Sequence, residues 1–193
     1  MTIPQTRQII NLLRHKGVSF DKGLSDSEVE QVQNKFGVNF PPDLKRLLQL
    51  QLPISESFIN WRKGLTNDEE AKKIWFMLNW TWEGMLIDMK KYNFWVKSWG
   101  DKPTDNESAI KIAKQYYDSY PKLIPIYAHR FIPNEPNEIG NPVFSIKEMD
   151  IIYYGYDLAT YFANEFYFKL NDSFPVIDEP KRIEFWSWCV ERN

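Results

Sequence analysis

The chain has 193 residues, of which 43% are hydrophobic and 26% charged, and this balance excludes disorder over most of its length. A chain of this length is enough for one domain with a proper hydrophobic core. The formal net charge of −2 at pH 7 argues against sequence-independent nucleic-acid binding, because such binding needs a basic surface that displaces counterions.

Three helices are predicted in the N-terminal part of the chain. The first covers residues 5–16, where apolar side chains precede a glycine stop. The second begins after Ser25, which forms a capping box with Glu28, and ends at Gly37. The third opens at Pro41-Pro42-Asp43, since proline is tolerated in the first turn of a helix.

The middle of the chain is harder to assign. Residues 58–61 are predicted as a short strand. Thr66 and Glu69 form a second capping box, and the helix behind it is expected to run toward residue 79. Residues 84–89 fit either a strand or a helix, and periodicity does not separate the two.

The C-terminal half alternates helices with short strands. Helical spacing predicts helices over residues 105–120 and 158–166 and a last helix around 183–190. Three short apolar runs between the first two helices are β-branched and bounded by Pro, Asn or Gly. We therefore expect neighbouring strands of one sheet, joined by structured loops, over residues 123–127, 143–146 and 151–154.

Three blocks of this chain, over about residues 24–168, resemble the SUKH superfamily in its Smi/Knr branch. The first block is LSDSEVEQVQNKFGVNFPPDLKRLL, a capped helix followed by a Pro-Pro-Asp helix start. The second is Asn93-Phe94-Trp95 with Trp99-Gly100 and Pro103. The third joins Pro125-Ile126-Tyr127, His129-Arg130, residues 141–145, Asp150-Ile151-Ile152-Tyr153-Tyr154-Gly155, Leu158 and Tyr161.

The resemblance implies a single α+β domain over residues 1–193, with a mostly antiparallel central sheet flanked by helices. Residues 170–193 lie outside the match and are expected to form a C-terminal helical extension. The resemblance implies no cofactor and no established catalytic set. Bacterial members of the family often act as immunity proteins that bind and neutralise a toxin, and a yeast member regulates cell-wall glucan synthesis.

His129 and Arg130 are the strongest candidates for chemistry. Histidine could act as a general base and arginine as an anion clamp, which would make a hydrolase that uses His129 the weakest of the alternatives. The chain has no Gly-x-Ser-x-Gly nucleophile elbow, and a metal site with Glu135 or Glu138 lacks a recognised ligand spacing. We instead expect both side chains to be at least half buried and to pin a loop by hydrogen bonds, with acids such as Asp150 as partners.

Aromatic residues are dense, with 8 Trp, 10 Tyr and 13 Phe. Trp95 and Trp99 could therefore form a stacking platform for sugar rings or bases. The alternative, which we favour, is that both indoles fill the core beside the sheet. Cys189 is the only cysteine, which excludes an internal disulfide, and we expect it to be a small buried hydrophobe.

Acidic residues are concentrated in the C-terminal part, where residues 134–192 hold 11 acids against 5 bases. Such a surface would suit a basic protein partner, for example a nuclease toxin. Four acids in or beside predicted loops are candidates for this contact: Glu135, Glu138, Glu148 and Asp157.

The sequence therefore predicts a non-enzymatic protein-binding module. Toxin immunity is the leading hypothesis, and regulation of cell-wall synthesis is the alternative. The start of the chain lacks a basic segment that leads into an apolar stretch, as a signal peptide would have. The longest apolar run, residues 74–78, is far too short to span a bilayer. We expect a cytoplasmic protein without membrane contact, without a cofactor and without direct nucleic-acid binding.

Overall fold

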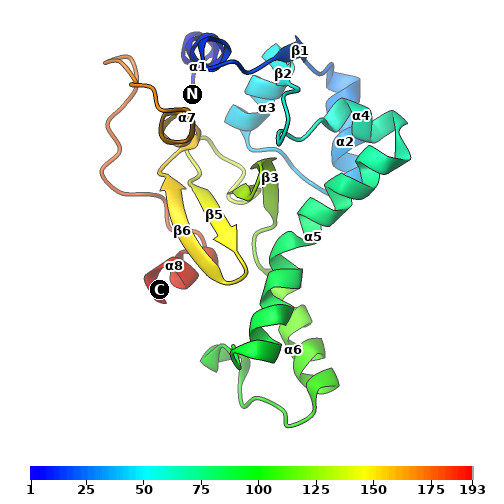
Figure 1. The fold of residues 1–193 in the computed structure, drawn as a ribbon. Helices are drawn as coiled ribbons and strands as arrows, with labels where there is room; N and C mark the ends of the chain where they lie inside the picture. The colour runs from blue at the N-terminus through cyan, green and yellow to red at the C-terminus, as the bar shows by residue number, and fades with distance from the viewer. Residues whose placement is uncertain (193) are drawn as a thin grey trace.

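The computed structural model describes residues 1–192, and this part of the chain contains eight α-helices, one 3-10 helix and two antiparallel sheets (Figure 1). The expected α+β class, with an antiparallel sheet flanked by helices, is confirmed. No helix within the described residues is long and apolar enough to cross a membrane.

A helical layer forms from the N-terminal part of the chain. It contains α1 (Ile3–His15), α2 (Asp26–Phe36) and α3 (Pro42–Leu50), so the three predicted helices are confirmed. Two strands of three residues, β1 (Phe20–Lys22) and β2 (Gln51–Pro53), pair antiparallel between them.

The caps of α2 explain where this helix begins and ends. The backbone N–H of Glu28 donates to Ser25 Oγ at 3.2 Å, and the Ser25 N–H donates to Glu28 Oε2 at 2.8 Å. Gly37 has φ of +61°, a left-handed conformation that glycine adopts without a steric penalty. The predicted capping box and glycine stop are both confirmed.

Two predictions in the middle of the chain are wrong. Residues 58–61 are no strand: Phe58 makes one isolated bridge to Tyr127, and Trp61 already begins α4 (Trp61–Thr66). The next helix is capped by Asn67, whose side chain accepts from the Glu70 N–H at 3.0 Å, in place of the predicted Thr66. An Asn one residue further on accepts from the Glu70 N–H, where a Thr66 cap would accept from the Glu69 N–H, and the sequence signal did not separate the two caps.

The longest helix, α5 (Asp68–Lys91), runs past the predicted end at residue 79 and includes residues 84–89. It is followed by the 3-10 helix η1 (Lys97–Trp99) and by α6 (Asn106–Ser119), which was predicted. In Figure 1, α6 lies beside the C-terminal half of α5, and the two project away from the N-terminal helices.

The main sheet has the order β3 (Leu123–Tyr127), β4 (Arg130–Pro133), β5 (Val143–Lys147) and β6 (Asp150–Gly155). All three predicted strands are present in one sheet. The segment that starts at Arg130 was predicted as a loop, but it forms β4 between two of them. This correction follows from pairing with neighbours on both sides, which local sequence does not show.

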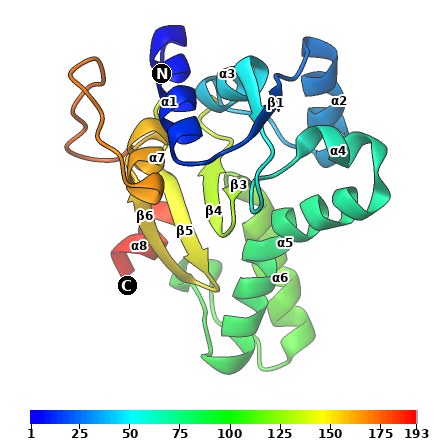
Figure 2. The same ribbon diagram turned by 45° about the horizontal axis from the view of Figure 1, so that its top comes forward.

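The sheet separates two hydrophobic clusters. One cluster joins its first face to α1–α4 and to α7 (Leu158–Phe166). The other joins its second face to the end of α5, to α6 and to α8 (Trp186–Arg192), which begins three residues later than predicted. Figures 1 and 2 show α7 and α8 on opposite sides of β5 and β6.

Candidate partner-binding surface

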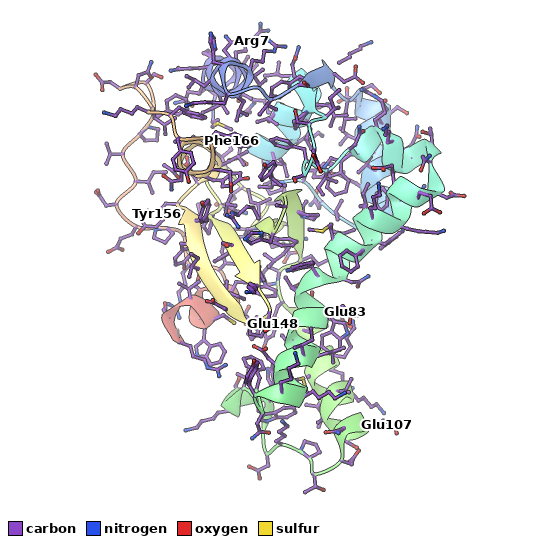
Figure 3. The ribbon with its side chains drawn as sticks, viewed as in Figure 1. Arg7, Glu83, Glu107, Glu148, Tyr156 and Phe166 are labelled. Carbon is purple, nitrogen blue, oxygen red and sulfur yellow. The ribbon has the colours of Figure 1, made fainter. Side chains whose placement is uncertain are left out.

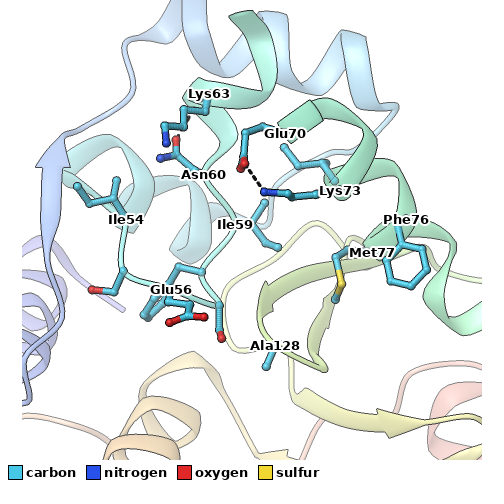
Figure 4. A pocket seen from close by; sticks show the side chains of 14 residues that line it. Ile54, Glu56, Ile59, Asn60, Lys63, Glu70, Lys73, Phe76, Met77 and Ala128 are labelled. Atoms are coloured by element: carbon cyan, nitrogen blue, oxygen red, sulfur yellow. Dashed lines mark hydrogen bonds and ion pairs between the residues drawn. The ribbon is translucent and has the colours of Figure 1, made fainter. Parts of the chain in front are cut away.

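A cleft of about 420 Å³ opens between the loop after β2 and the N-terminal half of α5 (Figure 4). Its apolar lining comes from both elements and includes Ile54, Ile59, Ile74, Phe76 and Met77. Ile54 is 41% exposed and Phe76 is 59% exposed, so the cleft presents large apolar side chains to solvent. Isolated exposed apolar residues are ordinary, but a group around a cleft is typical of an interaction site.

Charged groups form a polar rim around this cleft. Lys73 Nζ donates to Glu70 Oε1 at 2.6 Å along α5, Lys63 lies near Glu70, and Glu56 lies across the cleft from them (Figure 4). The exposed ion pair contributes little to stability. An apolar floor with a polar rim is the usual anatomy of a protein-binding patch.

Two residues that line the cleft have a strained backbone conformation. Ser57 has φ of +72° and Ala128 has φ of +44°, both uncommon for residues with a side chain. The Ala128 N–H donates to the Ser57 carbonyl at 2.9 Å, which ties the β3–β4 turn to the loop after β2. Such strain is retained only where the surrounding structure enforces it.

Three aromatic rings continue the cleft toward α7. The Phe58 ring centroid lies 4.8 Å from that of Tyr127 and 5.9 Å from that of Phe166, and Tyr127 and Phe166 are 5.4 Å apart. Phe58 lines the cleft and Phe166 is the last residue of α7. The rings therefore link the cleft to the sheet and to α7 through rigid packing.

Arg130 is the predicted site residue with the most contacts. Its Nε donates to Glu165 Oε2 at 2.8 Å, its Nη1 donates to Ser145 Oγ at 3.0 Å, and its guanidinium lies 3.9 Å from the Tyr154 ring centroid. Arg130 is buried and hydrogen-bonded, as predicted. Its carboxylate partner comes from α7, whereas the proposed Asp150 is an exposed residue at the start of β6.

His129 is exposed, and the prediction that its ring pins a loop by hydrogen bonds is wrong. Its backbone carbonyl accepts from the Ile146 N–H at 3.1 Å, but within residues 1–192 its ring makes no side-chain hydrogen bond. Partial desolvation, followed by the Arg130 charge, lowers the pKa of His129. A general base is usually oriented by a second side chain, and no side chain within residues 1–192 hydrogen-bonds the His129 ring.

The described residues contain no group of three or more His, Cys, Asp or Glu side chains placed to hold a metal ion. The Pro-rich loop near His129 includes Glu135 and Glu138. Glu138 Oε2 instead accepts from Lys181 Nζ at 2.9 Å, while Glu135 is exposed.

The four candidate acids do not form one face. Asp157 is buried and caps α7, where its Oδ1 accepts from the Thr160 N–H at 2.7 Å, so the prediction that it is free to reach a partner is wrong. An Asp followed three residues later by Thr, just before an apolar run, was the sequence signal for this cap. Glu148 lies in the β5–β6 turn beside α5 (Figure 3), at the opposite end of β6 from Asp157.

The two indoles of the WxxxWG stretch have different environments. Trp99 is buried, and its Nε1 donates to the Tyr120 hydroxyl at 2.8 Å. Trp95 is half-buried, and its Nε1 donates to the Gly100 carbonyl at 2.7 Å. Trp99 is thus a core residue, and the two do not form a shared exposed platform.

The cleft itself was missed at the level of sequence, although a signal was present. Residues 74–78, Ile-Trp-Phe-Met-Leu, are apolar at five successive positions. A helix can turn only one stripe of such a run toward its core, so some of the side chains must face outward. Trp75 and Phe76 are the exposed ones.

Comparison of the chain with protein-family models, with curated proteins and with solved structures finds no match. The fold and this surface therefore define the chain as an α+β protein with an open, polar-rimmed apolar cleft beside its main sheet.

Proposed function

We propose that this chain is a non-enzymatic protein-binding module that acts in the bacterial cytoplasm as an immunity protein and neutralises a toxin. The observation that carries the proposal is the apolar cleft between α5 and the loop after β2. It would receive one or two large apolar side chains of the toxin, while the polar rim would contact the residues around them.

The exposed apolar side chains of the cleft support a binding role over a purely structural one. Ile54 and Phe76 are large apolar side chains that are 41% and 59% exposed, so a partner could bury them. Burial of a large apolar side chain at the centre of an interface contributes about 1.5–3 kcal/mol. Large anchors of this kind carry most of the affinity in protein–protein contacts.

We infer the class of the partner from the resemblance of three sequence blocks to the SUKH superfamily. Immunity proteins of that kind block a toxin by covering its surface, which requires no catalytic group on the covering protein. The environment of His129, without an orienting side-chain partner within residues 1–192, supports the same non-enzymatic mode.

The test uses co-expression with a toxin encoded beside the gene for this chain. We expect the chain to restore growth, and Phe76→Asp to abolish protection and weaken toxin binding by about tenfold or more, because a charge in the cleft opposes apolar burial. Val176→Asp is the matched control, since Val176 is 88% exposed and lies outside the cleft.

Both variants should stay folded, because exposed substitutions usually change stability by about 0.5 kcal/mol. Equal protection by both variants would exclude the cleft as the contact. If no toxin gene lies beside the gene for this chain and the chain protects against no toxin, the result would favour the alternative role in regulation of cell-wall synthesis.

A further inference from the structure

A second recess lies away from the cleft, where α8 meets the segment around η1. Its volume is about 450 Å³, and its lining consists of Trp95, Val96, Lys97, Ser98, Trp188 and Arg192. Trp188 belongs to the C-terminal tail, outside the part of the chain that resembles a known family. The tail therefore brings a second indole to the recess that Trp95 lines.

Both indoles are held in place by contacts that do not use the recess. Trp95 donates its Nε1 hydrogen to Gly100 and packs edge-on against Trp99 with centroids 5.2 Å apart. Trp188 stacks on Phe185 at 5.9 Å with an interplanar angle of 25°. Rings fixed before binding lose little conformational freedom when a flat ligand stacks on them.

The charge of the recess is one-sided. Among residues 1–192, its lining contains two cations, Lys97 and Arg192, and no carboxylate. The Arg192 guanidinium lies 4.7 Å from the Phe94 ring centroid and 5.6 Å from that of Trp188, and the Lys102 ammonium lies 5.9 Å from the Trp95 centroid. Stacked on aromatic rings, a guanidinium can still present its N–H edge to an anion.

Asp88 and Glu191 lie outside the lining. Arg192 acts electrostatically on Asp88 of α5. Glu191 is engaged in a bidentate ion pair with Arg182. The recess therefore combines aromatic faces with an excess of positive charge.

We propose that this recess binds a free nucleotide, with the base stacked on the Trp95 indole and the phosphate held by Lys97 and by Arg192, whose guanidinium lies against the Trp188 ring. Indole faces stack on any base, and the two cations supply the charge that a phosphate requires. A neutral sugar would use the rings but gain nothing from the cations. The volume of the recess falls within the range of about 300–1,000 Å³ that is usual for small-molecule sites. This activity is separate from the cleft and does not depend on the proposed immunity role.

The experiment titrates the full chain with four probes: AMP, adenosine, inorganic phosphate and the neutral glucan laminaritriose. Binding is followed by NMR of the indole N–H signals and by tryptophan fluorescence. We expect saturable binding of AMP with a Kd of about 1 mM or below. Adenosine should bind about fivefold or more weakly, and added salt should weaken AMP binding but leave adenosine binding unchanged.

Variants then separate stacking from charge. Lys97→Met and Arg192→Met should each weaken AMP binding by about fivefold, because each removes a phosphate contact, and Lys97→Met should leave adenosine binding unchanged. Arg182→Met is the matched control, since Arg182 is an exposed cation outside the lining, and it should bind AMP like the parent chain. AMP binding that does not saturate, or that is unaffected by Lys97→Met and Arg192→Met, would overturn the proposal. Tighter binding of laminaritriose than of AMP would also overturn it, in favour of a sugar platform.

Discussion

Cys189 illustrates how burial sets the chemistry of a single side chain. It is buried in α8, and desolvation raises the pKa of its thiol to about 12, against a smaller opposing effect of Arg192. The thiolate is the reactive form, so we expect the folded protein to react with a thiol reagent at pH 8 about a hundredfold more slowly than the protein unfolded in guanidinium. Equal labelling rates in the two states would contradict this assignment.

The ion pair between Arg130 and Glu165 is the strongest candidate for a single interaction that fixes the sheet against α7. Their side chains are 10% and 15% exposed. Arg130→Met leaves the Glu165 charge in a buried place without its partner, and we expect the free energy of unfolding to fall by about 3 kcal/mol in urea titrations.

A second substitution distinguishes a lost attraction from a stranded charge. Arg130→Met combined with Glu165→Leu should recover about half of the loss, because neither partner is then charged. Lys114→Met serves as the surface control, since the pair of Lys114 with Asp118 is largely exposed, and its effect should be about 0.5 kcal/mol or less. A double variant as unstable as the single one would show that Arg130 acts through packing alone.

Glu28 gives the protein a defined response to acid. Hydrogen bonds from Arg62 and from the Ser25 N–H lower the pKa of Glu28 to about 2. The pKa of the folded state is below that of the unfolded chain, so this stabilisation is complete above about pH 4.5 and is lost as the pH falls toward 2. We expect Glu28→Gln to be less stable than the parent at pH 7 and to lose less stability between pH 5 and pH 2.5.

Urea midpoints measured across that range provide the test. Glu69→Gln is the matched control, because Glu69 also pairs with a lysine, Lys72, but both side chains are more than 70% exposed. Its pH dependence should follow that of the parent. A Glu28→Gln protein with the parent's acid sensitivity would contradict the assigned cause.

At the scale of elements, α5 and the β5–β6 turn approach each other through Gly84. A Cβ atom at this position would lie 2.7 Å from the Cα of Glu148, closer than side-chain atoms pack. The Met149 N–H also donates to Asp88 Oδ2 of the same helix, at 3.2 Å. The β5–β6 turn therefore packs directly against the backbone of α5 at Gly84, where no side chain stands between them.

Gly84→Ala should destabilise the protein by about 1–3 kcal/mol, because the hairpin must move to admit the methyl group. Helix propensity alone predicts the opposite sign, a gain of about 1 kcal/mol from Ala over Gly. Glu83→Ala on the exposed side of the same helix is the control and should change stability by about 0.5 kcal/mol or less. Thermal unfolding of the three proteins decides between packing and propensity.

At the scale of the whole molecule, the acidic C-terminal part affects how fast a basic partner would associate. Glu135 and Glu138 lie in an exposed loop, although Glu138 also pairs with Lys181. If the toxin is basic, reversal of both acids to lysine should slow association and reduce its salt dependence, with little effect on dissociation. Stopped-flow binding at several salt concentrations measures this. Unchanged rates would show that this acidic surface is not used.

Local patterns in the sequence were sufficient for most of the helices and strands. The reciprocal bonds of Ser25 and Glu28, the stop at Gly37 and the strands around Ile126, Phe144 and Ile152 all follow from interactions between close neighbours in the chain. The Asn67 cap was not predicted because Thr66, one residue earlier, is an equally plausible cap. The strand that starts at Arg130 was not predicted because it depends on pairing with β3 and β5.

The candidate sites follow the same division. The sequence by itself determined the α+β class, the burial of Cys189 and the presence of reactive or aromatic residues such as His129, Arg130 and Trp95. The tertiary structure decided that Arg130 meets Glu165, that Asp157 is a buried cap, and that Trp95 and Trp188 line the same recess. The physical reason is that caps, turns and periodicity are set within about four residues, whereas ion pairs, clefts and stacked rings join segments that meet only when the chain folds.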